Sequence, residues 1–182
     1  SKHPVTHSAA DIDAARKASF DVKEKNSWNN VWWLDPVLKG QYPEQGLRLF
    51  GPDMPAGYEN DLADMHPPVD FIGMNIYTSA PVRAGKDGEP EEVKWPDGYP
   101  RTGVDWQQVV PQSLYWGPRF FHERYQLPIF ITENGCSTRD QIFLDGKIHD
   151  PQRIDILNRY LLELSRAIAD GSFQFGADPF SY

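Results

Sequence analysis

The sequence is poor in several residue types, and each shortage excludes a class of protein. One cysteine among 182 residues rules out an internal disulfide framework and a Cys-rich zinc site. Eighteen Lys and Arg against 26 Asp and Glu give a net charge of −8, so the chain lacks the positive field that nucleic acid or an anionic membrane requires. No stretch approaches the ~18 apolar residues of a transmembrane helix.

The beginning of the sequence also lacks a targeting signal. Its first residues, SKHPVTHSAAD, contain no apolar core, and we therefore expect no signal peptide. The single cysteine favours a cytoplasmic location.

Apolar and aromatic residues, by contrast, are plentiful. They make up 40% and 13% of the chain, with six Trp, eight Tyr and ten Phe, which is too many for a disordered segment. The length corresponds to one domain, which we assign to residues 1–182.

The first third of the chain predicts a long helix followed by a turn-rich segment. We expect the helix over Ser8–Leu34, capped by Ser8 or Asp11 and stopped by Asp35-Pro36, because a residue before proline disfavours the α region. Trp28, Trp32 and Trp33 share much of one helix face and are predicted to pack in the core. Residues 39–68 are rich in Gly and Pro, which predicts loops with short helical turns.

Two short apolar runs predict strands of a parallel sheet. Val69–Tyr77 and Pro128–Glu133 are apolar enough to be covered on both sides. Between them we expect a long loop over Thr78–Val110 and a helix over Pro111–Tyr125. Pro118 is predicted to kink or split that helix.

The last third predicts a turn and an amphipathic helix. Asp145-Gly146 is typical of a tight hairpin turn, and Asp150-Pro151 of a helix start with an aspartate N-cap. Apolar residues then recur at steps of three and four up to Asp170, and Gly171 is the expected C-cap glycine; the stripe comprises Ile154, Leu157, Leu161, Leu164 and Ile168. The tail, SFQFGADPFSY, shows no clean continuation. Strands that alternate with helices favour an α/β fold.

Polar residues with catalytic potential lie at the carboxyl ends of both predicted strands. The first ends with Asn75 and Tyr77, and the second with Glu133 and Asn134. A carboxylate there can act as nucleophile or base, and a phenol and a carboxamide can orient it. Each residue alone also has an ordinary structural interpretation, as a turn or core residue.

The combination of these motifs resembles glycoside hydrolase family 1, the β-glucosidase family. Five segments agree in order with that family: DAARKASF (13–20), WWLDPVLKGQYP (32–43), FIGMNIYT (71–78), LPIFITENG (127–135) and DGKIHDPQRIDILNRYLLELSRAIADG (145–171). The resemblance implies that Glu133 is the catalytic nucleophile, that Tyr77 hydrogen-bonds it, and that Asn75 lies close to the bound sugar. It implies a β-glycoside substrate and neither a metal nor an organic cofactor.

The resemblance also implies an incomplete fold. The family forms a (β/α)8 barrel, and barrels of this kind usually need at least ~200 residues. The matched segments correspond to about strands six and seven, with flanking helices and long loops. We therefore interpret the chain as the C-terminal part of a barrel, which would expose apolar surface unless a complementary part or self-association covers it.

The acid/base half of the mechanism is missing from the sequence. The family places this glutamate in an Asn-Glu-Pro motif, which the chain does not contain; residues 88–90 and 42–44 are only superficial echoes of it. A retaining glycosidase needs a second carboxyl group ~5–5.5 Å from the nucleophile. We therefore expect little activity from the chain alone.

Two other interpretations stay open. The chain could be a non-catalytic remnant that binds a sugar or a partner through aromatic residues, for which the candidates are Trp95, Tyr99, Trp106 and Trp116. It could also be a truncated gene product without an evolved function. The five histidines show no metal-ligand spacing, and Cys136 is interpreted as a small buried residue.

Overall fold

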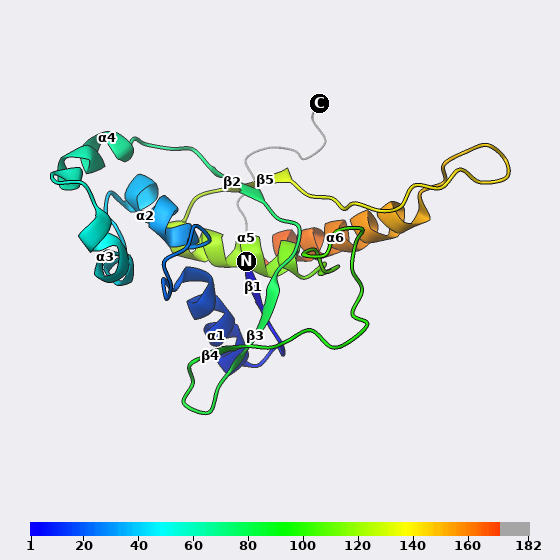
Figure 1. Ribbon diagram of the computed structural model, residues 1–182, viewed down its shortest axis with the longest axis horizontal. Helices are drawn as coiled ribbons and strands as arrows, with labels where there is room; N and C mark the ends of the chain where they lie inside the picture. The colour runs from blue at the N-terminus through cyan, green and yellow to red at the C-terminus, as the bar shows by residue number, and fades with distance from the viewer. Residues whose placement is uncertain (172–182) are drawn as a thin grey trace.

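The computed structural model describes residues 1–171, which form two small β-sheets with helices packed against them (Figure 1). The first sheet has the order β1-β3-β4: β1 (Lys2–Pro4) runs parallel to β3 (Ala80–Ala84), and β4 (Pro90–Glu92) is antiparallel to β3. The second sheet pairs β2 (Ile72–Asn75) with β5 (Ile129–Glu133) in parallel. The predicted α/β class and the parallel strand pair are thereby confirmed. The predicted tail after Gly171 lies outside the described residues.

The predicted single helix over Ser8–Leu34 is wrong, because the structure contains two helices there. Helix α1 (Ala9–Phe20) begins as expected, with the Ser8 hydroxyl accepting from the Asp11 N–H at 3.2 Å. It ends at Asp21, whose backbone is extended, and the next residue, Val22, is buried and donates its N–H to Gln45. This tertiary contact ends the helix, and α2 (Asn30–Lys39) starts afresh.

Asp35-Pro36 does not stop a helix either, because Pro36 lies inside α2. Asp35 is 4% exposed, and its carboxylate accepts from the Arg124 guanidinium at 2.6 Å and from the Tyr125 hydroxyl at 2.7 Å. These bonds hold Asp35 in helical conformation against the steric preference of a pre-proline residue. The helix ends at Gly40, which adopts the left-handed conformation with φ of 65°.

The tryptophan cluster behaves only in part as predicted. Trp32 is 6% exposed and stacks on Phe50, with ring centroids 4.6 Å apart. Trp28 and Trp33, however, are 86% and 57% exposed, so the expectation of core packing is wrong for both. The segment that follows contains α3 (Glu44–Phe50), two short 3-10 helices (Gly51–Asp53 and Tyr58–Asp61) and α4 (Leu62–Met65), in line with the predicted short helical turns.

The predicted loop between Thr78 and Val110 contains regular structure that the sequence did not indicate. Strands β3 and β4 lie within it, and Arg101 and Gln108 form an isolated antiparallel bridge. Strand β3 pairs with β1, which lies near the start of the sequence, and a pairing over such a distance leaves no local sequence signal.

Helix α5 (Ser113–Tyr125) passes through Pro118 without a break, so the predicted split is wrong. An interior proline costs a helix ~3 kcal/mol through its missing N–H. Packing offsets this loss, because α5 buries eight of its residues, among them Pro118 itself. The helix contributes Tyr115, Trp116, Phe120 and Phe121 to the main core cluster, where they meet Ile72 and Ile129 of the second sheet.

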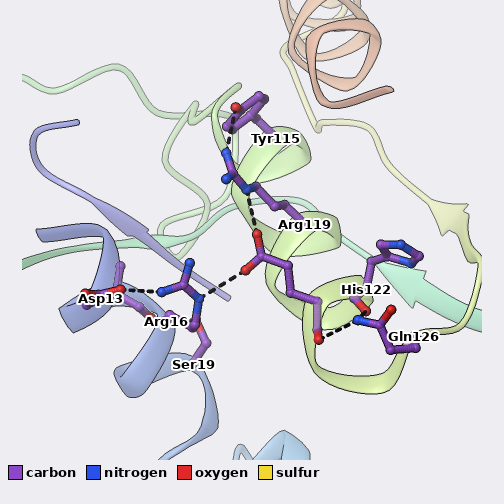
Figure 2. Close-up of polar contacts among 9 residues, drawn as sticks. Asp13, Arg16, Ser19, Tyr115, Arg119, His122 and Gln126 are labelled. Carbon is purple, nitrogen blue, oxygen red and sulfur yellow. Dashed lines mark hydrogen bonds and ion pairs between the residues drawn. The ribbon is translucent and has the colours of Figure 1, made fainter. Parts of the chain in front are cut away.

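A chain of polar contacts on the outside of this core joins α1 to α5 (Figure 2). Arg16 of α1 forms ion pairs with Asp13 on its own helix and with Glu123 on α5. Glu123 also accepts from Arg119, which in turn donates to the Tyr115 hydroxyl at 3.0 Å. Because these groups are partly solvated, the contacts add little to the free energy of unfolding. Their main effect is to align the two helices.

Helix α6 (Pro151–Ala169) starts at Pro151 and ends one residue before the predicted Asp170, and Gly171 has the expected positive φ of 73°. Asp150 is the N-cap residue as predicted, but its side chain makes no capping hydrogen bond and instead pairs with Arg153. The helix packs on α5 through Tyr160 and Ala167, which are buried. Much of its predicted apolar stripe is solvent-exposed, with Ile154 63% and Leu161 59% accessible. The expectation that the chain exposes apolar surface is thus confirmed.

None of the helices in residues 1–171 combines the length and the apolar character needed to cross a bilayer.

Candidate active site

The parallel pair β2–β5 brings the two predicted strand ends together. Asn75, the last residue of β2, lies in register with Glu133, the last residue of β5. The ladder continues one residue further, where the Ile76 N–H donates to the Glu133 carbonyl at 2.9 Å. Parallel strands place their carboxyl ends at one edge of the sheet, which is why residues 56 positions apart in the sequence, Tyr77 and Glu133, become neighbours here.

The Tyr77 hydroxyl donates a hydrogen bond to Glu133 Oε2 at 2.5 Å. This bond is the largest cause of a raised pKa for the Tyr77 phenol, which is therefore a neutral donor throughout the physiological range. Glu133 itself is exposed, so its carboxylate stays open to an incoming ligand. The arrangement is a solvent-facing carboxylate held in one orientation by a phenol.

Asn75 sits beside this pair with its carbonyl oxygen occupied. The Thr132 hydroxyl donates to Asn75 Oδ1 at 2.6 Å, which fixes the carboxamide and leaves its nitrogen available to donate to a ligand. On the other side, the Asn134 side chain donates to the Ile76 carbonyl at 2.7 Å and ties the turn after β5 to the end of β2. The structure thus brings Asn75, Tyr77 and Glu133 into one site.

The loop before α5 closes onto the turn after Glu133. Gln107, which is 3% exposed, donates its side-chain amide to the Gly135 carbonyl at 2.7 Å, and the Gly103 N–H donates to the Ser137 carbonyl at 2.6 Å. Gly135 has a φ of 149°, a conformation that favours glycine, so this turn depends on the residue type. Sequence reasoning missed Gln107, because a glutamine in a long loop carries no signal of its own.

The four aromatic candidates for ligand binding divide between surface and core. Trp106 is 61% exposed, and its ring meets the Tyr77 ring edge-on with centroids 6.1 Å apart, so it borders the site. Trp95 and Tyr99 pack on each other, with ring centroids 4.1 Å apart. Trp116 is 3% exposed and belongs to the core. Cys136 is half-buried rather than buried, and this burial raises the pKa of its thiol.

The sheet that carries the site has one covered and one open face. Ile72 and Ile129 belong to the core cluster that includes residues of α5. Phe71 and Phe130, by contrast, are 55% and 54% exposed, and their ring centroids are 5.8 Å apart. Asn75 and Glu133 are exposed as well. Among residues 1–171, β2 and β5 pair only with each other, which leaves one edge of each strand open.

The sequence model of glycosyl hydrolase family 1 matches residues 1–175. The chain belongs to this family. Among its curated relatives, β-glucosidase A of Thermotoga maritima is 32% identical over 153 residues, covering 82% of this chain and 34% of the relative. β-Glucosidase A of Acetivibrio thermocellus is 35% identical over 176 residues, covering 93% of this chain and 37% of the relative.

Solved family 1 structures show the same likeness in three dimensions. The family 1 β-glucosidase from Thermotoga maritima in complex with isofagomine lactam superposes with a TM-score of 0.71 at 29% identity, covering 94% of this chain and 37% of that one. These neighbours are (β/α)8 barrels, and this family 1 chain is a partial α/β structure that spans little more than a third of their length.

Proposed function

We propose that Glu133 is the nucleophile of a retaining β-glycosidase site, with Tyr77 orienting it and Asn75 binding a sugar hydroxyl. The observation that carries this proposal is the 2.5 Å hydrogen bond from Tyr77 to Glu133 at the ends of adjacent parallel strands. In a retaining mechanism the nucleophile attacks the anomeric carbon and expels the leaving group, which forms a covalent glycosyl–enzyme that water then hydrolyses. A carboxylate held in one rotamer approaches that carbon along a fixed line.

The family fold supports a position for the two strands. We assign β2 and β5 to about strands six and seven of a (β/α)8 barrel, with residues 1–182 as a single incomplete domain. The exposed face that carries Phe71 and Phe130 then corresponds to the barrel interior. The substrate is a β-linked glucoside or a similar β-glycoside, and a cytoplasmic location stays a prediction from the lone cysteine.

The second carboxyl group is proposed to come from outside this sequence. The chain has no Asn-Glu-Pro motif, and general acid–base help is worth ~10²–10⁴-fold in rate. The open edges of β2 and β5 support a complementary part of the barrel as its source, with self-association as the other way to cover these edges.

A substrate whose leaving group needs no protonation tests nucleophilic attack separately from acid catalysis. A 2,4-dinitrophenyl 2-fluoro-β-glucoside expels a stable phenolate, so attack by Glu133 can proceed without an acid. We expect mass spectrometry to find one fluoroglucosyl group on the peptide that contains Glu133, and none in the Glu133→Gln variant. Glu44→Gln is the matched control, since Glu44 is an exposed helix residue paired with Arg48.

A complementary polypeptide with the Asn-Glu-Pro motif should then restore hydrolysis of an unactivated aryl β-glucoside. Binding of β-glucosides without any labelling would instead favour a non-catalytic sugar-binding remnant. If the chain neither labels nor binds, with or without the complementary part, the proposed function is wrong.

A further inference from the structure

The Tyr160 hydroxyl, from the middle of α6, lies directly beneath the candidate active site. It donates to the Tyr77 carbonyl at 2.8 Å and accepts from the Val110 N–H at 2.8 Å. The side chain is 1% exposed and packs with Ile76 and Leu114 in a small apolar cluster. One hydroxyl thus connects helix α6, the segment that leads into α5, and the end of the strand that carries the site.

Burial fixes the chemical state of this hydroxyl. It raises the pKa of Tyr160 to about 12, so the phenol keeps its proton and can donate to a carbonyl at any physiological pH. Both partners are main-chain groups, and a main-chain group that loses its partner in a buried site costs ~1–3 kcal/mol. The two bonds therefore fix the position of the Tyr77 main chain relative to α6 more firmly than apolar packing alone.

Two further bonds on Ile76 complete the support of this segment. Its N–H donates to the Glu133 carbonyl at 2.9 Å, and its carbonyl accepts from the Asn134 side chain at 2.7 Å. These contacts come from β5 and the turn after it, whereas the contact of Tyr160 comes from helix α6. Ile76 makes the last bond of the strand ladder and Tyr77 lies beyond it, so the contact from Tyr160 holds the main chain where the ladder has ended.

We propose that Tyr160 is a positioning residue of the glycosidase site, which holds the Tyr77 main chain so that the Tyr77 phenol reaches Glu133. This inference rests on the proposed function for its catalytic consequence. Its geometric part, that Tyr160 sets the contact between Tyr77 and Glu133, can be tested without any turnover.

The test compares two buried tyrosine hydroxyls, Tyr160 on α6 and Tyr115 on α5, which each bond to a residue outside their own helix. Tyr160→Phe removes the hydroxyl beneath Tyr77. Tyr115→Phe is the matched control, because Tyr115 is also buried and its hydroxyl donates to Asp170 at 2.6 Å without touching the site. The chain is produced with ¹³Cζ-labelled tyrosine, and its spectra are followed from pH 7 upward. The Tyr77 resonance is the one that Tyr77→Phe removes.

In the parent chain, the hydrogen bond to Glu133 holds the pKa of Tyr77 above its usual value. We expect Tyr160→Phe to move the Tyr77 titration down toward that usual value, and Tyr115→Phe to leave it in place. The rate of fluoroglucosyl labelling at Glu133 should fall about 10-fold or more in Tyr160→Phe only, because misplacement by about an ångström can cost ~100-fold.

The inference is overturned if neither variant moves the Tyr77 titration, or if both move it equally, since an equal effect reports general loosening between the helices. It is also overturned if Tyr160→Phe fails to fold, because the hydroxyl would then support the whole fold. If the parent chain is never labelled, the proposed function fails, while the Tyr77 titration still decides the geometric part.

Discussion

Arg153, in the first turn of α6, donates from Nε to the Cys136 carbonyl at 3.3 Å, three residues after the proposed nucleophile. The same guanidinium pairs with Asp140 and Asp150, each at 2.8 Å. One arginine thus connects the start of α6 to both ends of the segment that joins β5 to this helix. These three contacts make the segment after Glu133 part of the site's scaffold.

We expect Arg153→Gln to release this segment. Amide hydrogen exchange over residues 137–149 should become at least about 10-fold faster, because the connection would lose two ion pairs and a main-chain contact. Arg159→Gln is the matched control, since Arg159 lies on the same helix and, within residues 1–171, its ion pair is with the exposed Asp155 at 2.9 Å. Equal exchange in both variants would show that the segment is held by other contacts.

A second prediction concerns the buried carboxylate of Asp35, which holds α2 against α5. Removing it in Asp35→Ala would leave the Arg124 guanidinium and the Tyr125 hydroxyl without their shared partner. We expect a loss of ~3 kcal/mol in the free energy of unfolding, measured by urea denaturation. Arg48→Ala breaks an ion pair whose side chains are 66% and 83% exposed, and it should cost less than ~1 kcal/mol. Comparable losses in the two variants would contradict the assigned role of burial.

Local signals in the sequence predicted the elements that depend on local chemistry. The Ser8 cap, the helix start at Pro151 and the two short apolar strands are examples, because each depends on residues within a few positions. The proximity of Tyr77 and Glu133 could also be predicted, from the carboxyl ends of two parallel strands together with the family resemblance.

Contacts between distant segments explain the failures. Pro36 and Pro118 lie inside helices because tertiary packing and the bonds of Asp35 outweigh the local cost of proline. Strand β3 was not predicted because its partner β1 is distant in the sequence, with Ala80 in register with Lys2. No local signal singles out Tyr160 within its helix, since no neighbouring residue in the sequence indicates that its hydroxyl reaches Tyr77.

A third prediction concerns stability in acid, through His3 near the start of the chain. His3 is 8% exposed and shares a 2.7 Å hydrogen bond with Ser79. Burial, together with the nearby N-terminal ammonium group, lowers the pKa of His3 from 6.5 to about 4. The unfolded chain therefore binds more protons than the folded chain between these pH values, so stability falls as the pH drops through this window.

The measurement is the free energy of unfolding from pH 7 to pH 4, in the parent chain and in His3→Asn. We expect the parent chain to lose up to ~3 kcal/mol through this one group, and the slope to become shallower in His3→Asn. His7→Asn is the control, because His7 is exposed, and it should keep the slope of the parent chain. An unchanged slope in His3→Asn would assign the acid sensitivity to other groups.

The last prediction isolates the contribution of the Tyr77 phenol to the proposed nucleophile. Tyr77→Phe keeps the ring, and with it the edge-on contact with Trp106 at 6.1 Å, but removes the hydrogen bond to Glu133. The carboxylate is exposed, so it would then sample several rotamers instead of one. We expect the rate of fluoroglucosyl labelling at Glu133 to fall ~10–100-fold, with little change in stability, because the lost bond lies at the surface.

Tyr99→Phe provides the matched control, because Tyr99 lies in the long segment that follows Tyr77 and packs on Trp95 rather than on the site. It should label at the rate of the parent chain. Trp106→Ala separates orientation from ligand contact: it keeps the bond between Tyr77 and Glu133, and it should weaken binding of the aryl glucoside more than it slows the labelling of bound enzyme. A Tyr77→Phe chain that labels as fast as the parent would show that Glu133 needs no orienting donor, and Tyr160 would then have no catalytic consequence through Tyr77.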